Sequence, residues 1–176
     1  TAVDDGVTTV PCDAMAVDEQ RRAMVRCCRR MWRRGIFAAM EGNVSVRVSE
    51  ERFLITASGV HKGTMAVGDV LLLDAALRSE KNQKPSKESA MHASLYQQIP
   101  ECNAVVHEHP ASATAFACAG ISIPDDVLVE TATGLGTVGF VPFAPPGSAA
   151  LAESVATCAV RHAALLMRNH GALTWG

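Results

Sequence analysis

Apolar residues recur along the chain with two different periods, which predict helices and strands in alternation. From Asp18 to Gly35 the apolar positions return every three to four residues, as in an amphipathic helix, and Gly35 suits its C-cap. Valines alternate with polar residues over 42–48, which predicts a half-buried strand in a hairpin with a second strand at 53–56. The same criteria predict strands at 70–73, 104–107 and 165–167, and helices at 88–98, 111–119 and 149–161.

This interleaving of helices and strands favours a single layered domain of the α/β (α+β) class. A chain of 176 residues suits one compact domain, and 48% hydrophobic with 19% charged residues is not a disordered composition. We expect residues 1–17 to form a loose N-terminal arm and residues 18–176 to form the domain. The segment 121–142 has irregularly spaced glycines and receives no assignment.

Charge and cysteine content narrow the function classes. The net charge is −2, and the arginines between 29 and 34 are interpreted as the solvated end of a helix rather than a nucleic-acid surface. None of the six cysteines forms a CxxC pair, which favours free thiols in a reducing compartment. No apolar run reaches the ~20 residues that cross a bilayer, and no signal peptide is recognised. We therefore expect a cytoplasmic protein that binds neither nucleic acid nor a membrane.

The segment His107-Glu108-His109 is the first strong candidate for chemistry. Residues i and i+2 of a strand project from one face, so both imidazoles can reach one zinc ion; two histidines exposed by chance are an equally weighted alternative. His170 is the best third ligand, because it stands between an apolar strand and Gly171, and sites collect at strand ends. Three histidines leave one coordination position open, which is typical of catalytic zinc.

Glu88 and the remaining histidines allow more than one interpretation. His92 follows Glu88 by four residues, which permits a metal pair but is more typical of an ordinary helix contact. Glu88 stands at a helix start, where a carboxylate either caps the helix or acts as acid/base near the metal, and capping is the commoner role. Glu108 should point away from its histidine neighbours, while His61 and His162 lie in a turn and at a helix end.

Short loops with glycine and hydroxyl or amide side chains are candidates for binding an anion. Gly42-Asn43 and Ser58-Gly59 each pair exposed backbone N–H groups with a side-chain donor, and Ser86 adds a hydroxyl. Such loops cradle phosphate without a P-loop. Glycine-bearing turns after strands are common, however, so each loop alone is a weak signal.

Taken in order, these segments resemble the class II aldolase/adducin family, and the fuculose-phosphate aldolases in particular. The matching stretches are GNVSVR at 42–47, TASG at 56–59, KPSKESAMHASLY at 84–96, AVVHEHP at 104–110, PFAPPGS at 142–148 and LLMRNHGAL at 165–173. The resemblance runs from about residue 18 to residue 176. Its most specific part is the histidine pair followed at a distance by Asn-His-Gly.

The resemblance implies a fold, a metal site and a reaction. It implies a central, mostly antiparallel sheet flanked by helices, in a homotetramer with active sites at subunit interfaces. It implies that zinc is bound by His107, His109 and His170, and that Glu88 is the catalytic acid/base. The phosphate-binding set implied or compatible with it is Gly42, Asn43, Ser58, Gly59, Ser86 and Lys87. The implied reaction cleaves a ketose 1-phosphate to dihydroxyacetone phosphate and an aldehyde.

Three features depart from the aldolase pattern. Lys87 stands where a second phosphate-binding serine is common, and this form is similar to relatives that decarboxylate four-carbon oxo-acid phosphates. Leu128 falls about where a proton-donating tyrosine is expected, and Glu130 is either a substitute acid or, as we favour, a surface residue. The chain stops at Gly176, whereas relatives continue, so further C-terminal helices are expected to be missing.

Several alternatives to an aldolase stay open. A decarboxylase of a 3-oxo-tetronate phosphate is the strongest rival within the family, and a dehydratase or epimerase of a sugar phosphate would use the same metal site. Glu88 speaks against an epimerase, because those relatives resemble an aspartate form at this position. From another class, an adducin-like binding module or a structural metal protein is disfavoured by the full set of three histidines.

Overall fold

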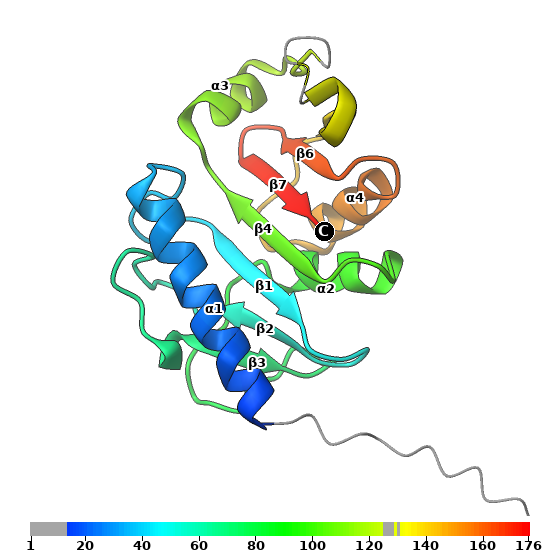
Figure 1. Cartoon of the computed structure of the whole chain (residues 1–176). Helices are drawn as coiled ribbons and strands as arrows, with labels where there is room; N and C mark the ends of the chain where they lie inside the picture. The colour runs from blue at the N-terminus through cyan, green and yellow to red at the C-terminus, as the bar shows by residue number, and fades with distance from the viewer. Residues whose placement is uncertain (1–13, 125–128, 130) are drawn as a thin grey trace, which may run out of the picture.

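Figure 1 shows the computed structural model of the chain, which describes residues 14–124, 129 and 131–176. The helices of this part are α1 (Ala14–Arg33), α2 (Ser89–Gln98), α3 (Ala111–Ala119) and α4 (Ala149–Ala159), with short helical turns η1 (Val67–Asp69) and η2 (Thr131–Leu135). The strands are β1 (Asn43–Arg47), β2 (Phe53–Thr56), β3 (Val70–Leu73), β4 (Ala104–Glu108), β5 (Gly139–Val141), β6 (Ala164–Met167) and β7 (Gly171–Trp175).

Within the described residues the strands form one sheet in the order β3-β2-β1-β4-β7-β6-β5. Neighbouring strands run antiparallel, except that β5 and β6 are parallel. The predicted hairpin is present, with Val46 of β1 opposite Leu54 of β2. A mixed, mostly antiparallel sheet flanked by helices confirms the predicted fold class.

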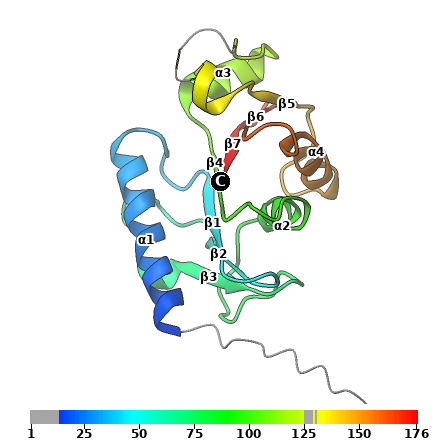
Figure 2. The same cartoon turned by 45° about the vertical axis from the view of Figure 1, so that its right-hand side comes forward.

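Helices cover both faces of the sheet, and this explains the strand sequences. Figure 2 shows α1 on one side of β1–β3 and the helices α2 and α4 on the other side. Side chains alternate between faces along a strand, so Leu54 of β2 packs under α1 while Phe53 and Ile55 face the larger core cluster. Every residue of β2 is buried, as is every residue of β3 and β6. Strands of this kind are continuously apolar because both of their faces are covered.

The structure differs from the sequence prediction at the boundaries of two helices and in two strands that were not predicted. The first helix begins at Ala14 rather than Asp18, so residues 14–17 of the expected arm are helical, and Val17 is buried against the sheet. Strand β5 lies in the segment that received no assignment, and β7 follows the turn at His170, where no strand was predicted. Helix α4 ends at Ala159 instead of Arg161. Both unpredicted strands are formed by pairing with β6. Strand formation by pairing depends on tertiary contacts, which local sequence preference does not reveal.

No helix within the described residues is both long and apolar enough to cross a membrane.

Two valines of α4 offer a matched test of where the core lies. Val155 is 0% exposed inside the larger core, whereas Val160 is 57% exposed at the C-cap of the same helix. We expect Val155→Ala to lower the free energy of unfolding by about 2 kcal/mol, because two buried methyl groups are lost and a cavity remains. Val160→Ala should change it by less than about 0.5 kcal/mol. Urea denaturation of the two variants measures the difference, and equal losses would contradict the described packing of α4.

Candidate metal centre and active site

Three histidines from two neighbouring parts of the sheet meet at one point. His107 and His109 lie on β4 and directly after it, and His170 lies in the turn between β6 and β7. That turn depends on its flanking residues. Asn169 has a positive φ of 54°, and a Cβ on Gly171 would lie 2.5 Å from Cδ2 of His109. Glycine is therefore needed at 171 for the turn to approach the pair on β4.

The ligand atoms of these histidines are spaced as a single metal ion requires. One ring nitrogen from each of His107, His109 and His170 lies within 4.8 Å of the other two. The Nε2 atoms of His107 and His109 are 3.2 Å apart. Tetrahedral bonds of about 2.0–2.1 Å would place two nitrogen ligands about 3.3 Å apart. The structure thus brings together the predicted ligand set, which suggests a metal site.

Hydrogen bonds outside the cluster orient two of the rings. Nδ1 of His107 lies 2.9 Å from the carbonyl oxygen of Ala172 on β7, and it donates there because a carbonyl can only accept. The lone pair of Nε2 in His107 is then directed toward the other histidines. Nδ1 of His109 lies 3.4 Å from a carboxylate oxygen of Glu41. Partners of this kind hold metal-binding imidazoles in the correct tautomer and orientation.

The carboxylate of Glu88 faces the histidines instead of capping its helix. Glu88 occupies the N-cap position of α2, but its side chain makes no capping hydrogen bond. Its Oε2 lies 3.2 Å from Nε2 of His107, and its Oε1 lies 3.2 Å from Nε2 of His170. Oε1 is buried and has no hydrogen-bond partner among the described residues. A carboxylate oxygen in that state is suited to meet a metal ion or a substrate.

Burial alone would raise the pKa of Glu88, but the close approach of His107 and His170 and the hydrogen bond from Asn43 outweigh burial and hold the pKa well below its usual range. Glu88 is therefore ionised at neutral pH.

A buried chain of hydrogen bonds runs from Glu88 along the interface between α2 and β1. Nδ2 of Asn43 donates to Oε2 of Glu88 at 2.8 Å, which leaves Oδ1 of Asn43 to accept from Nε2 of His92. Nδ1 of His92 must then accept from the hydroxyl of Ser45 at 2.6 Å, and Ser45 accepts from Tyr96 at 2.6 Å. Because the ionised Glu88 can only accept, it fixes which atom of each following group donates and which atom accepts. His92 is thus a positioning residue rather than half of a metal pair.

The sequence shows the regular spacing of the residues in this hydrogen-bond network, but it does not show that the residues on α2 bond to those on β1. Glu88, His92 and Tyr96 recur every four residues on one face of α2, and Asn43 and Ser45 share one face of β1. Sequence reasoning missed their connection because it depends on α2 packing across β1.

All six residues expected to bind phosphate line the same cavity as the metal site. The cavity has a volume of about 380 Å³ and also exposes Glu88, His109 and His170. Its expected phosphate-binding residues are Gly42, Asn43, Ser58, Gly59, Ser86 and Lys87. The lining residues that sequence reasoning missed are Met40, Ala57, Lys62 and Pro146.

Backbone contacts hold the loops of this cavity in place. The N–H of Ser58 donates to the carbonyl of Lys84 at 3.0 Å, which joins two of the loops. Gly42 has a φ of 68°, and a Cβ there would lie 2.6 Å from the carbonyl oxygen of His107. Only glycine allows the turn before Asn43 to lie this close to β4, the strand that carries His107.

Other predicted candidates lie elsewhere. Glu108 is directed away from the histidines, as predicted, and lines a small cavity with Met31 of α1. Burial raises the pKa of Glu108 to about 7. His61 lies against Trp32 of α1, with their ring centroids 5.5 Å apart. Leu128 and Glu130 lie outside the described residues.

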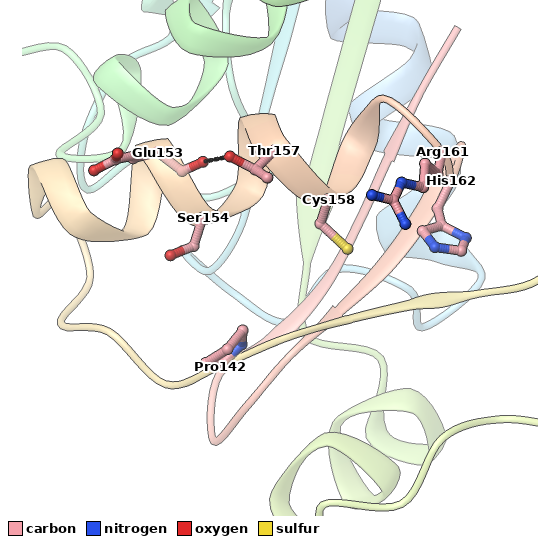
Figure 3. Close-up of a pocket in the computed structure, with 7 residues that line it drawn as sticks. All are labelled: Pro142, Glu153, Ser154, Thr157, Cys158, Arg161 and His162. Atoms are coloured by element: carbon pink, nitrogen blue, oxygen red, sulfur yellow. Dashed lines mark hydrogen bonds between the residues drawn. The ribbon is translucent and has the colours of Figure 1, made fainter.

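A second cavity of about 450 Å³ runs beside α4, away from the histidine cluster (Figure 3). It is lined by Pro142, Glu153, Ser154, Thr157, Cys158, Arg161 and His162. Two of its polar groups are engaged locally, since Thr157 donates to the Glu153 carbonyl and Nδ1 of His162 bonds the Thr137 carbonyl. No cluster of metal-ligating atoms is found there within the described residues.

The metal site can be tested without knowledge of a substrate. We expect His170→Ala to bind a divalent metal at least about 100-fold more weakly than the unmodified chain, because one of three ligands is lost. His162→Ala removes a histidine outside the cluster and should bind metal normally. Calorimetric titration of the metal-free proteins, with elemental analysis after dialysis, measures both. Equal metal binding by the two variants would contradict the three-histidine site.

The hydrogen-bond chain predicts a pH-dependent contribution to stability. Burial, followed by the nearby His107, lowers the pKa of His92 to about 3, so His92 is neutral in the folded protein. We expect His92→Leu to lower the free energy of unfolding at pH 7 by about 1–3 kcal/mol, because Asn43 and Ser45 lose buried partners.

The difference between the two proteins should shrink as pH falls from 7 to 5. In the unfolded state His92 has an ordinary pKa of about 6.5 and becomes protonated as pH falls, whereas in the folded state it stays neutral. This lowers the stability of the unmodified protein but not that of His92→Leu. Urea denaturation at several pH values provides the measurement. A difference that is constant with pH would contradict a neutral, buried His92.

Comparison with known proteins agrees with this arrangement. A family model described as "Class II Aldolase and Adducin N-terminal domain" matches residues 22–176. The chain is 33% identical over 162 residues to 3-oxo-tetronate 4-phosphate decarboxylase of Haemophilus influenzae, which covers 89% of this chain and 77% of that protein. It is 34% identical over 154 residues to methylthioribulose-1-phosphate dehydratase of Methylococcus capsulatus, with coverages of 81% and 76%.

An aldolase is similar to a comparable degree. L-fuculose phosphate aldolase of Escherichia coli is 32% identical over 150 residues, covering 85% of this chain and 69% of that protein. The crystal structure of l-fuculose-1-phosphate aldolase from Thermus thermophilus has a TM-score of 0.79 at 30% identity, covering 92% and 80% of the two chains. The match of the family model over most of the chain, these identities and the shared fold show that the chain belongs to the class II aldolase and adducin N-terminal domain family.

Proposed function

We propose that this protein is a zinc-dependent lyase that cleaves a ketose 1-phosphate to dihydroxyacetone phosphate and an aldehyde. The observation that carries the proposal is one cavity lined by phosphate-type loops, a buried carboxylate, and His109 and His170 of the three-histidine cluster. The relatives named above act on phosphorylated sugars or sugar acids, which supports a substrate of that class.

Zinc is the metal that suits this ligand set best. Three neutral imidazoles with tetrahedral spacing and an open position are typical of catalytic zinc. Zinc bound there by His107, His109 and His170 would supply Lewis acidity to the carbonyl and neighbouring hydroxyl oxygens of the substrate.

The residues of the chain would bind the substrate and move a proton. The loops containing Asn43, Ser58 and Ser86 would hold the phosphate and so direct the carbonyl end of the substrate toward the histidines. When the bond between carbons 3 and 4 breaks, its electron pair stays on carbon 3, which must receive a proton. Glu88 faces the metal site and, being ionised, would first accept the proton that the carbon-4 hydroxyl loses and then deliver it to carbon 3. The atoms then balance to dihydroxyacetone phosphate and an aldehyde.

Decarboxylation of a 3-oxo-tetronate 4-phosphate is the second candidate. Lys87 favours it, because the side chain is exposed in the cavity where a second serine is common in the aldolases, and it can meet an extra negative charge. The decarboxylase of Haemophilus influenzae is among the similar proteins, at 33% identity. Loss of carbon dioxide also leaves an electron pair on carbon, so the same metal and Glu88 would serve.

The expected assembly and location are part of the proposal. We infer a cytoplasmic homotetramer with active sites at subunit interfaces, as in the fuculose-phosphate aldolases that the chain resembles.

The decisive experiment joins metal content with product formation. The zinc-loaded protein would be assayed for dihydroxyacetone phosphate release from a panel of ketose 1-phosphates, and in parallel for carbon dioxide release from 3-oxo-tetronate 4-phosphate. We expect Glu88→Gln to retain zinc and to lose about 100-fold or more of turnover, since proton transfer by a positioned side chain contributes at least that much.

Glu101→Gln is the matched control, because Glu101 is exposed on the loop before β4. It should retain both zinc and turnover. Release of carbon dioxide alone would replace the aldolase by the decarboxylase. Full turnover in Glu88→Gln would contradict its role, and zinc-loaded protein without any lyase activity on these substrates would sink the proposal.

A further inference from the structure

Lys62 is a buried lysine in the wall of the active-site cavity. Its side chain is 1% exposed, which makes it the largest fully buried residue described in the chain. Its Nζ donates to the carbonyl oxygens of Val60 at 3.0 Å and Met40 at 3.4 Å, and its backbone N–H donates to the Ala39 carbonyl at 2.9 Å. Lys62 therefore joins the loop after Gly59 to the turn that precedes Gly42-Asn43.

The positive charge of Lys62 has no counter-ion within the described residues. It takes part in no ion pair there, and the group that interacts with it electrostatically is the thiol of Cys28 on α1. Burial raises the pKa of Cys28 to about 12, so the thiol is uncharged at neutral pH. Burial in turn lowers the pKa of Lys62, and Cys28 only partly opposes this. Buried charges are normally paired, so an unpaired one calls for a partner.

The position of Lys62 indicates what that partner is. The residue lines the cavity together with Gly42, Asn43, Ser58 and Gly59, the segments proposed to bind the substrate phosphate. An ammonium group has three N–H donors, and backbone carbonyls accept from two of them. A charge enclosed by protein also acts on an anion more strongly than one in water.

We propose that Lys62 is an anion-recognition residue of this cavity, whose fixed positive charge lies behind the two loops and complements the phosphate group of the substrate. The proposal deepens the proposed function and rests on it for the identity of the ligand. Lys87 differs in kind, because its side chain is exposed and must be ordered when it meets an anion. Lys62 is already held by its hydrogen bonds, so its charge is preorganised.

Two probes separate anion recognition from support of the loops. Inorganic phosphate tests the anion site, and acetohydroxamate, which chelates zinc and carries no phosphate, tests the integrity of the metal end of the cavity. Both would be titrated calorimetrically into the zinc-loaded chain and into Lys62→Met and Lys62→Gln. Lys62→Met keeps the apolar length of the side chain, and Lys62→Gln keeps a donor for the Val60 or Met40 carbonyl. Lys81→Met is the matched control, because Lys81 is exposed and bonds the Gly68 carbonyl.

We expect both Lys62 variants to bind phosphate at least about tenfold more weakly, and acetohydroxamate within about twofold of the unmodified chain. Lys81→Met should match the unmodified chain with both probes. Unchanged phosphate affinity in a folded Lys62 variant would overturn the proposal. Equal weakening of both probes, or weakening in Lys62→Met but not in Lys62→Gln, would overturn it in favour of loop support. These titrations measure binding and not turnover. A lyase assay that fails would therefore not change what they show about Lys62.

Discussion

The register of β4 between β1 and β7 is the constraint on which the site depends. Asn43 of β1 lies opposite His107 of β4, and His107 lies opposite Leu173 of β7. This pairing places the amide that holds Glu88 beside the first histidine, and it places the turn with His170 beside the second. A slip of one residue would turn His107 to the face that Glu108 now occupies, and the metal site would be lost.

The buried polar side chains between α2 and β1 form one set of hydrogen bonds with a single direction. The ionised Glu88 accepts from Asn43, and this fixes the direction of every further hydrogen bond through His92 and Ser45 to Tyr96. These hydrogen bonds between α2 and β1 therefore fix the orientation of the Glu88 carboxylate. Oε1 of Glu88, which has no hydrogen-bond partner among the described residues, and the charge of Lys62 both belong to the cavity. Buried polar groups without a protein partner are expected where a ligand binds.

Local patterns were sufficient to predict most of the fold and the three histidines that the structure brings together. The spacing in His107-Glu108-His109 and the Asn-His-Gly turn are local signals, and the valine alternation in 42–48 gave the β1–β2 hairpin. Strand β7 and the short β5 were missed, because their regularity comes from pairing with β6. The hydrogen-bond partners of His92 were not predicted for the same reason, since these partners on β1 lie 47 and 49 residues away in sequence. No local sequence pattern marks Lys62 as a binding residue, because its proposed role is inferred from its burial in the cavity wall.

The proposed binding of one zinc ion by three imidazoles beside Glu88 can be tested by X-ray absorption at the zinc edge of the metal-loaded protein. We expect three imidazole nitrogen ligands at about 2.0–2.1 Å, completed by oxygen from water or a carboxylate. A sulfur ligand at about 2.3 Å, or fewer than three imidazoles, would contradict it, because the metal would then lie elsewhere.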